Sequence, residues 1–220
     1  MRTAGGTTTP RPKRLTRAES KAITKARLLD AAATVFARKG FAATSVEDIA
    51  EAAGYTIGAL YSNFSGKEDL FLAVLDQHLA ADAELIAEIL GEASSGEDLL
   101  RRLAAYFDAM YEAEQDWRLL TNEFRLYVAR NPRFNSRLAE QKQAALQRLA
   151  RQIEHWCRAS GTALPVPAGQ VALITSALAD GLMQQKLVEP ESVSGRTFSM
   201  ALEWLFRGLG DSEAGRDDPS

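Results

Sequence analysis

The apolar residues of this chain recur at intervals of three and four from about residue 20 onward. No segment alternates apolar and polar residues between hairpin signals, so the pattern does not predict a β-strand. Caps and turn residues divide the periodic part into expected helices at 23–40, 45–53, 56–64, 67–91, 97–113, 116–130, 133–159, 168–188 and 191–208. The sequence therefore predicts an all-α fold.

Two of these expected helices are short and meet across one glycine, in the stretch SVEDIAEAAGYTIGALYSNF at residues 45–64. Thr44 or Ser45 caps the first, and an acidic residue three positions on completes a capping box. Gly54 ends it, and the second begins near Thr56. A connection this short prevents the helices from lying antiparallel, which is typical of a helix-turn-helix. A new cap, Ser65, starts the following helix.

Charge is distributed unevenly along the 220 residues, whose net charge is -3. Residues 1–67 hold 11 Lys and Arg against 5 Asp and Glu, which leaves 15 against 24 for residues 68–220. An excess of basic residues confined to the amino-terminal part predicts that this part alone meets an anionic partner. Residues 1–19 are rich in Gly, Thr, Pro and cations, and we expect a flexible basic arm there.

The segment TSVEDIAEAAGYTIGALYSNFSGKEDLFLAVL, with FARKGFAATS before it, closely resembles the DNA-binding module of TetR-family transcriptional regulators. The resemblance covers roughly sixty contiguous residues. It implies a helix-turn-helix domain at 20–67 with the motif at 45–64, Tyr61 against the DNA backbone and Lys67 on a phosphate. It also implies that residues 68–210 form a larger helical domain, which binds a small-molecule effector and dimerises through its last two helices.

A physical argument also favours a phosphate contact for Lys67. A lysine in the first turn of a helix opposes the helix dipole, and an anion bound there would explain its position. Gly58 inside a short helix costs about 1 kcal/mol relative to alanine. The glycine could be merely tolerated or could relieve crowding, and close approach to the duplex is slightly favoured over both.

The second short helix carries no arginine that could bind guanine with two hydrogen bonds, so direct readout of base edges should be thin. Leu60 and Phe64 should face the protein. Thymine-methyl contacts, hydroxyl hydrogen bonds and groove shape would then give specificity, and cations just upstream would give affinity. The candidate DNA-binding residues are Arg14, Arg17, Lys21, Thr44, Ser45, Tyr55, Thr56, Ile57, Gly58, Ala59, Tyr61, Ser62, Asn63 and Lys67.

Most aromatic residues, including every tryptophan, lie in residues 68–210. We predict that an effector pocket there is lined by members of one aromatic and methionine set, although such residues are more often plain core. The set is Tyr106, Phe107, Met110, Trp117, Phe124, Tyr127, Trp156 and Met183.

One apolar face on each of the last two expected helices predicts self-association as a two-fold dimer, although either face could instead be internal core. These faces consist of Val171, Ile174, Leu178 and Leu182 on the first helix, and Phe198, Leu202, Leu205 and Phe206 on the second. A dimer would place two recognition helices about 34 Å apart, in successive major grooves of a palindromic operator.

The sequence gives little support for a metal site, an enzyme or a membrane protein. His155 and Cys157 are two positions apart, so a helix points them in opposite directions, and no metal or cofactor is expected. Neither a GxSxG elbow nor a GxxxxGK[ST] phosphate loop occurs, which disfavours an enzyme. The single cysteine, the absence of a signal-peptide pattern and the lack of a long apolar run favour a cytoplasmic protein without membrane insertion.

Together these features predict a DNA-binding transcriptional regulator, most simply a repressor that leaves its operator when an effector binds. One alternative is an architectural protein that coats DNA without sequence preference, and a second is an α-helical enzyme. The last ten residues, 211–220, are expected to be a disordered tail.

Overall fold

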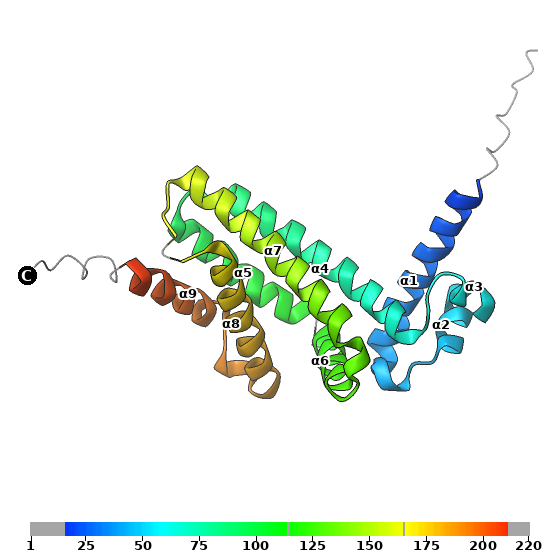
Figure 1. Cartoon of the computed structure of the whole chain (residues 1–220). Helices are drawn as coiled ribbons and strands as arrows, with labels where there is room; N and C mark the ends of the chain where they lie inside the picture. Colours follow the sequence, from blue (N-terminus) through cyan, green and yellow to red (C-terminus); the bar gives the residue numbers. More distant parts are fainter. Residues whose placement is uncertain (1–15, 114, 165, 211–220) are drawn as a thin grey trace, which may run out of the picture.

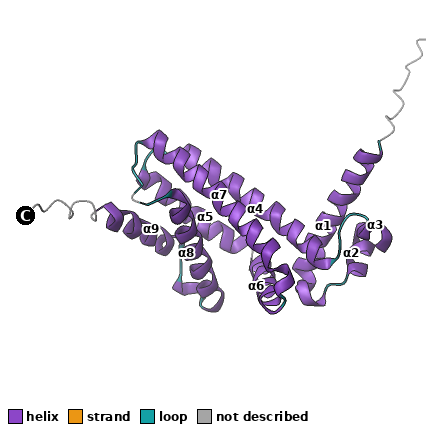
Figure 2. Cartoon of the chain, viewed as in Figure 1, coloured by secondary structure: helices purple, strands orange, loops and turns teal. Residues whose placement is uncertain are grey.

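The computed structural model describes residues 16–113, 115–164 and 166–210. Within those ranges the regular structure is entirely helical, as Figure 2 shows, and the all-α prediction is confirmed. The elements are α1 (Arg17–Ala43), α2 (Val46–Ala53), α3 (Ile57–Tyr61), α4 (Lys67–Glu92), α5 (Gly96–Ala113), α6 (Gln115–Arg130), η1 (Pro132–Phe134), α7 (Asn135–Ser160), α8 (Ala168–Val188), η2 (Pro190–Ser192) and α9 (Gly195–Gly210).

Helix α1 begins several residues earlier than the sequence pattern predicts. Thr16 is its N-cap, and Glu19 completes a capping box with it, so residues 17–19 are helical rather than part of a flexible arm. The apolar period does not reveal this helix start, because every residue from Thr16 to Ser20 is exposed and none belongs to a buried face. The rest of the predicted arm, residues 1–15, lies outside the described residues, as does the predicted tail.

Gly40 interrupts α1 with a φ of 78°, as expected for a stop signal, and one further turn follows. Ser45 is the N-cap of α2, and Asp48 completes its capping box. Gly54 ends α2 in the left-handed conformation, with a φ of 70°. The helix-turn-helix predicted at 45–64 is therefore present as α2, a tight turn and α3.

Helix α3 is shorter than predicted and ends at Tyr61 rather than near Phe64. The hydroxyl of Ser62 and the amide of Asn63 both donate to the Ala59 carbonyl, at 2.8 Å. Side chains of this kind compete with helical backbone hydrogen bonds. The predicted cap of the next helix is also wrong, because Gly66 is the N-cap of α4 and no side chain caps it.

The remaining helices match the predicted segments to within a few residues. The largest differences occur at α7 and α9, where a short 3-10 helix with proline at its start precedes the α-helix. None of the helices in the described ranges is long and apolar enough to cross a membrane.

Two apolar clusters hold the helices together. The first contains Phe36 and Phe41 of α1, Phe71 of α4 and Phe124 of α6, together with the buried residues of α2 and α3. It therefore crosses the predicted domain boundary at residue 67. The second cluster joins α5, α8 and α9 around Phe107 and Phe198, whose rings stack at 4.9 Å.

Figure 1 shows the resulting shape. Helices α1–α3 form a group at one end, α8 and α9 lie toward the other end, and α4 runs from the first group beside α7. Because α4 belongs to both parts, its position relates α2 and α3 to the rest of the molecule.

Candidate nucleic-acid interface

Helix α3 presents two sharply different faces. Leu60 and Phe64 are buried in the first apolar cluster, as predicted. On the opposite side Ile57 and Tyr61 are 41% and 54% exposed. Large exposed apolar side chains on a short helix offer contact surface without any internal partner.

The first helix of the motif, α2, is held in place by an ion pair and by its cap. Lys39 of α1 forms an ion pair with Asp48 of α2, at 2.8 Å. The Asp48 carboxylate also accepts from the Ser45 amide, at 3.0 Å. The Lys39 ammonium first, and then the Ser45 hydrogen bonds, lower the pKa of Asp48 to about 2. Asp48 is therefore charged at neutral pH and holds α2 on α1.

Several predicted polar contacts are already used inside the protein. The Thr56 hydroxyl accepts the Ala59 amide as the N-cap of α3, at 3.2 Å, and its side chain stays exposed. Ser62 and Asn63 bond the Ala59 carbonyl, and Ala59 itself is half-buried. Tyr55 is half-buried against the first cluster. Thr56, Ile57 and Tyr61 thus remain the most available side chains of this edge.

Gly58 has room for a larger side chain within the monomer. A Cβ built there would meet only the Thr56 hydroxyl oxygen, at 3.8 Å, which is an ordinary contact. Crowding inside the protein therefore does not explain the glycine. This finding removes relief of crowding and leaves two explanations, mere tolerance of the glycine and close approach by a partner.

A basic stripe, defined here as Arg17, Lys21 and Lys25, lies on one face of α1 at intervals of four residues. All three are exposed. The Lys25 ammonium lies over the Phe64 ring, 5.8 Å from its centroid, so this face is next to the end of α3. Arg14, the other predicted cation, lies outside the described residues.

Thr44 does not reach the surface. It is only 2% exposed, and its hydroxyl donates to the Gly40 carbonyl at 2.7 Å. Ser45, its half-buried neighbour, caps α2. As a DNA-binding candidate Thr44 is therefore wrong in this conformation, because the kink at Gly40 turns its side chain inward.

Lys67 has an internal role that the sequence did not reveal. Its ammonium donates to the carbonyls of Phe41, at 2.9 Å, and Ala42, at 3.3 Å, and lies 4.6 Å from the Phe41 ring centroid. Its place in the first turn of α4 therefore needs no bound anion to explain it. The dipole argument for a phosphate is wrong to that extent, although a third ammonium hydrogen remains.

The same turn is held from the other side by α6. The Glu123 carboxylate accepts the Phe41 amide at 2.8 Å and the Ala42 amide at 2.7 Å. One turn further along α6, the Tyr127 hydroxyl donates to Glu68 of α4 at 2.6 Å, and this bond raises the pKa of Tyr127. Sequence reasoning missed Glu123, since no local pattern indicates a partner 81 residues away.

The eight predicted effector residues do not line one cavity, so that set is wrong as a single pocket. They divide among three places because helices with similar aromatic content pack into different clusters. Trp117, Phe124 and Tyr127 belong to the first cluster, while Phe107, Met110 and Met183 belong to the second. Tyr106 is half-buried on α5, and Trp156 borders a cavity beside α7.

The predicted dimer faces are partly internal. Val171, Phe198 and Leu202 are buried within the chain, and Leu178 and Leu182 pack against the second cluster. Leu205 is half-buried. Exposed apolar residues also occur on these two helices and are together called here the α8–α9 apolar surface: Leu173, Ile174, Met200, Trp204 and Phe206. Only Ile174 and Phe206 of this surface were predicted.

Comparison with known proteins places these observations in a family. Residues 28–74, which contain most of α1, all of α2 and α3 and the start of α4, match the family described as bacterial regulatory proteins, tetR family. The chain is 41% identical over 86 residues to the HTH-type transcriptional repressor KstR2 of Rhodococcus jostii, covering 39% of this chain and 41% of that protein.

A second relative, the HTH-type transcriptional activator FasR of Mycolicibacterium smegmatis, is 34% identical over 97 residues, which is 44% of each chain. The matches thus span about two fifths of the length of these curated relatives. Among solved structures, a TetR-family transcriptional regulator from Pectobacterium atrosepticum superimposes with a TM-score of 0.63 and 26% identity, over 89% of this chain and 97% of that one.

These relatives are regulators rather than enzymes, in agreement with the absence of catalytic motifs from the sequence. The matched segment contains the helix-turn-helix and its supporting core, and the solved relative shares the arrangement of the larger helical part. The amino-terminal helices of this chain therefore match the tetR family of bacterial regulatory proteins over residues 28–74.

Proposed function

We propose that the protein is a sequence-specific, double-stranded DNA-binding transcriptional regulator that acts in the cytoplasm. The observation that carries this proposal is the exposed edge of α3, where Ile57 and Tyr61 stand outward from a helix anchored by Leu60 and Phe64. A helix-turn-helix places such an edge in the major groove. Thr56, at the start of α3, is the nearest exposed hydroxyl for a base edge or a phosphate.

Affinity would come mainly from the basic stripe on α1 and the cations that precede it. Arg17, Lys21 and Lys25 share one face beside the end of α3. Arg14 would add a further contact. Phosphate neutralisation by lysine and arginine releases counterions and dominates the salt dependence of DNA binding. The short edge of α3 then needs to supply specificity and little of the total affinity.

The bound unit would be a two-fold dimer formed through the α8–α9 apolar surface. Trp204 is 65% exposed, and Leu173, Ile174, Met200 and Phe206 of the same two helices are also exposed. Apolar surface gathered in this way is characteristic of protein interfaces. A two-fold axis would present two α3 helices to a palindromic operator.

Release by an effector requires a physical connection between the two parts of the chain. The first apolar cluster supplies one, since Phe41 of α1, Phe71 of α4 and Phe124 of α6 pack in mutual contact. A ligand that moved α4 or α6 would shift α2 and α3 relative to a partner protomer. One relative is a repressor and another is an activator. Of these two forms of regulation we propose the first, repression that ends when an effector releases the protein from its operator.

Genomic footprinting followed by a gel shift on the recovered sites tests the DNA-binding proposal. We expect retention of a palindromic site in excess nonspecific competitor DNA. Loss of all binding in that competitor would identify the architectural alternative instead. Effector and operator must also weaken each other by the same factor at equilibrium, because linkage is reciprocal; independent titrations would contradict regulation by release.

A further inference from the structure

A cavity of about 670 Å³ lies between the end of α4, the α4–α5 connection and the second half of α7. Leu90 and Trp156 supply apolar walls, and Arg148, Arg151 and His155 supply basic ones. No carboxylate lines this cavity. Its volume falls within the range of small-molecule sites, which combine apolar walls with a few polar groups.

Arg148 is the residue of this cavity that is least satisfied within the protein. Its Nε and Nη2 atoms are buried and have no hydrogen-bond partner among the described residues. Arginine keeps its charge in proteins, and a buried charge without a partner is costly. Gln152 on the same wall also has an unpartnered buried Oε1, although its Nε2 donates to the Ala83 carbonyl at 2.7 Å. The Arg148 side chain also lines the cavity, so an anion bound there would lie beside a positive charge that has no carboxylate partner among the described residues.

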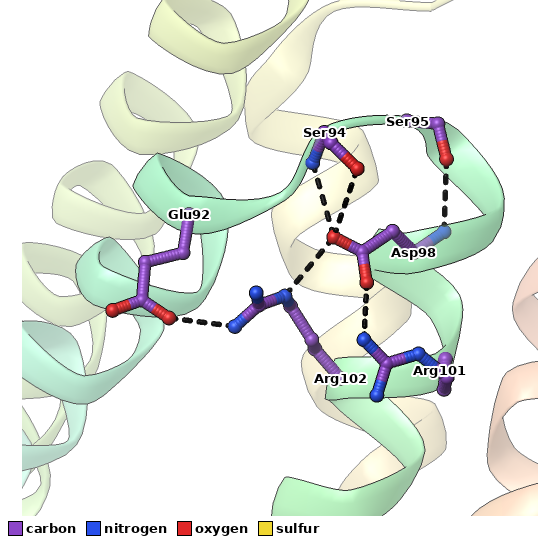
Figure 3. A network of polar contacts seen from close by, with 6 residues as sticks. All are labelled: Glu92, Ser94, Ser95, Asp98, Arg101 and Arg102. Atoms are coloured by element: carbon purple, nitrogen blue, oxygen red, sulfur yellow. Dashed lines mark hydrogen bonds and ion pairs between the residues drawn. The ribbon is translucent and has the colours of Figure 1, made fainter.

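The opposite wall is organised in advance. Figure 3 shows Asp98 of α5 accepting from the amide and hydroxyl of Ser94, at 3.1 and 3.3 Å, while Ser95 caps the Asp98 amide. Asp98 also pairs with Arg101 and, at 3.1 Å, with Arg102. The Ser94 amide first, and then the two guanidinium groups, hold the pKa of Asp98 well below its usual range.

Two consequences follow from this network. The connection that carries Ser94 and Ser95 is fixed before any ligand arrives, so little ordering cost is added on binding. The charge of Asp98 is also satisfied locally by Arg101 and Arg102, the latter of which reaches Glu92 at 2.6 Å as well. Asp98 and Glu92, which lie near this connection but do not line the cavity, therefore have partners other than Arg148.

We propose that this cavity binds an organic anion with an apolar body. A carboxylate or phosphate monoester would pair with Arg148 and Arg151, and an aliphatic or aromatic body would lie against Leu90 and Trp156. This inference deepens the proposed function by giving the chemical class of the effector, and only its effect on DNA binding rests on that function.

Calorimetry on the full chain without DNA tests the proposal with four probes: octanoate, octyl phosphate, 1-octanol and inorganic phosphate. We expect binding of octanoate, octyl phosphate or both, with 1-octanol and inorganic phosphate each at least tenfold weaker. The stronger of the two amphiphiles identifies the head group. Arg148→Met should weaken that probe at least about tenfold, which corresponds to about 1.4 kcal/mol.

Arg130→Met is the matched control, because Arg130 is exposed at the end of α6 and does not line the cavity. It should bind like the wild type. Without a probe, Arg148→Met should melt at the same temperature as the wild type or higher, since it removes an unpaired buried charge. Equal binding of octanoate, octyl phosphate and 1-octanol would overturn the proposal, and so would unchanged binding of the preferred probe by Arg148→Met.

Failure of this inference is distinguishable from failure of the proposed function. The calorimetric result needs no operator, so it stands whether or not the protein binds DNA. If the preferred probe binds through Arg148, adding it to the operator complex should lower DNA affinity in the wild type but not in Arg148→Met. Loss of operator binding in competitor DNA would contradict the proposed function and leave the ligand site intact.

Discussion

The Glu123 carboxylate of α6 accepts the Phe41 amide of α1 at 2.8 Å, just after the chain kinks at Gly40. The absence of a side chain at Gly40 allows this contact, because a Cβ there would lie only 2.8 Å from the Glu123 oxygen. The Lys67 ammonium of α4 binds the same residue through its other backbone group, because it donates to the Phe41 carbonyl at 2.9 Å. A single turn of α1 is thus held by both α4 and α6.

Glu123→Ala should lower the free energy of unfolding by about 1 to 2 kcal/mol, because it leaves the Phe41 and Ala42 amides without their acceptor. Chemical denaturation measures the change. Glu140→Ala, at an exposed glutamate of α7, should stay within about 0.5 kcal/mol of the wild type. Equal stability of the two variants would show that the Glu123 contact contributes nothing.

Tyr61→Ala should weaken operator binding by about 1 to 2 kcal/mol without changing stability, since the side chain is largely exposed and its loss removes one groove contact. Gel shifts on specific and nonspecific DNA, with a thermal melt of each variant, give the measurement. Leu119→Ala removes an exposed apolar side chain on α6 and should leave binding intact. Unaltered operator affinity in Tyr61→Ala would remove α3 from the interface.

Lys67→Met should reduce both stability and DNA affinity. The lost hydrogen bonds to Phe41 and Ala42 should cost about 1 kcal/mol of unfolding free energy, and a lost phosphate contact should flatten the salt slope by about one. Lys21→Met, at an exposed position of the basic stripe, should flatten the slope alike with unchanged stability. A wild-type slope in Lys67→Met would assign that lysine a structural role alone.

The Asp48 carboxylate should give stability an acid dependence. Its folded pKa of about 2 lies below the unfolded value of about 3.9, so its contribution is fully present above about pH 4 and is lost as pH falls toward 2. NMR titration should show the low pKa, and Asp48→Asn should remove that part of the acid slope. Asp76→Asn, at an exposed residue of α4, should keep the wild-type profile. A titration of Asp48 near pH 4 would refute the contact with Lys39.

Trp204→Glu should raise the dissociation constant of self-association at least tenfold, because it puts a charge in the centre of the α8–α9 apolar surface. Sedimentation at micromolar concentration measures it. Leu126→Glu changes a similarly exposed residue of α6 and should leave the assembly unchanged. A wild-type protein that is monomeric under these conditions yet binds its operator would contradict the dimer.

The interface was predictable where its signals are local. Ser45, Gly54 and Thr56 mark caps and a turn, and the spacing of Leu60 and Phe64 indicates the buried side of α3. Lys67 was misjudged because its partners, the carbonyls of Phe41 and Ala42, become neighbours only in the folded chain, whereas Thr44 bonds a carbonyl just four residues away, that of Gly40. A helical period identifies a face but not the element that covers it.

The effector set failed for a related reason. The aromatic residues of α5 and α6 and Met183 of α8 carry the same apolar signal whether they fill a core or border a cavity, and most of them fill one of the two clusters. The cavity beside α7 instead depends on Arg148, which ordinary sequence reasoning assigns to a solvated surface. Two of its guanidinium nitrogens are buried without a partner, which no local sequence pattern indicates.

The sequence by itself determined the helical class, the caps and turn of the helix-turn-helix and the basic character of the amino-terminal part, since each depends on residues within a few positions of one another. The tertiary structure alone decided that Glu123 and Lys67 hold the turn after Gly40, that one core joins the two parts and that Arg148 lies unpaired beside a cavity. These relationships join residues distant in the chain, and packing of whole helices is what brings them together.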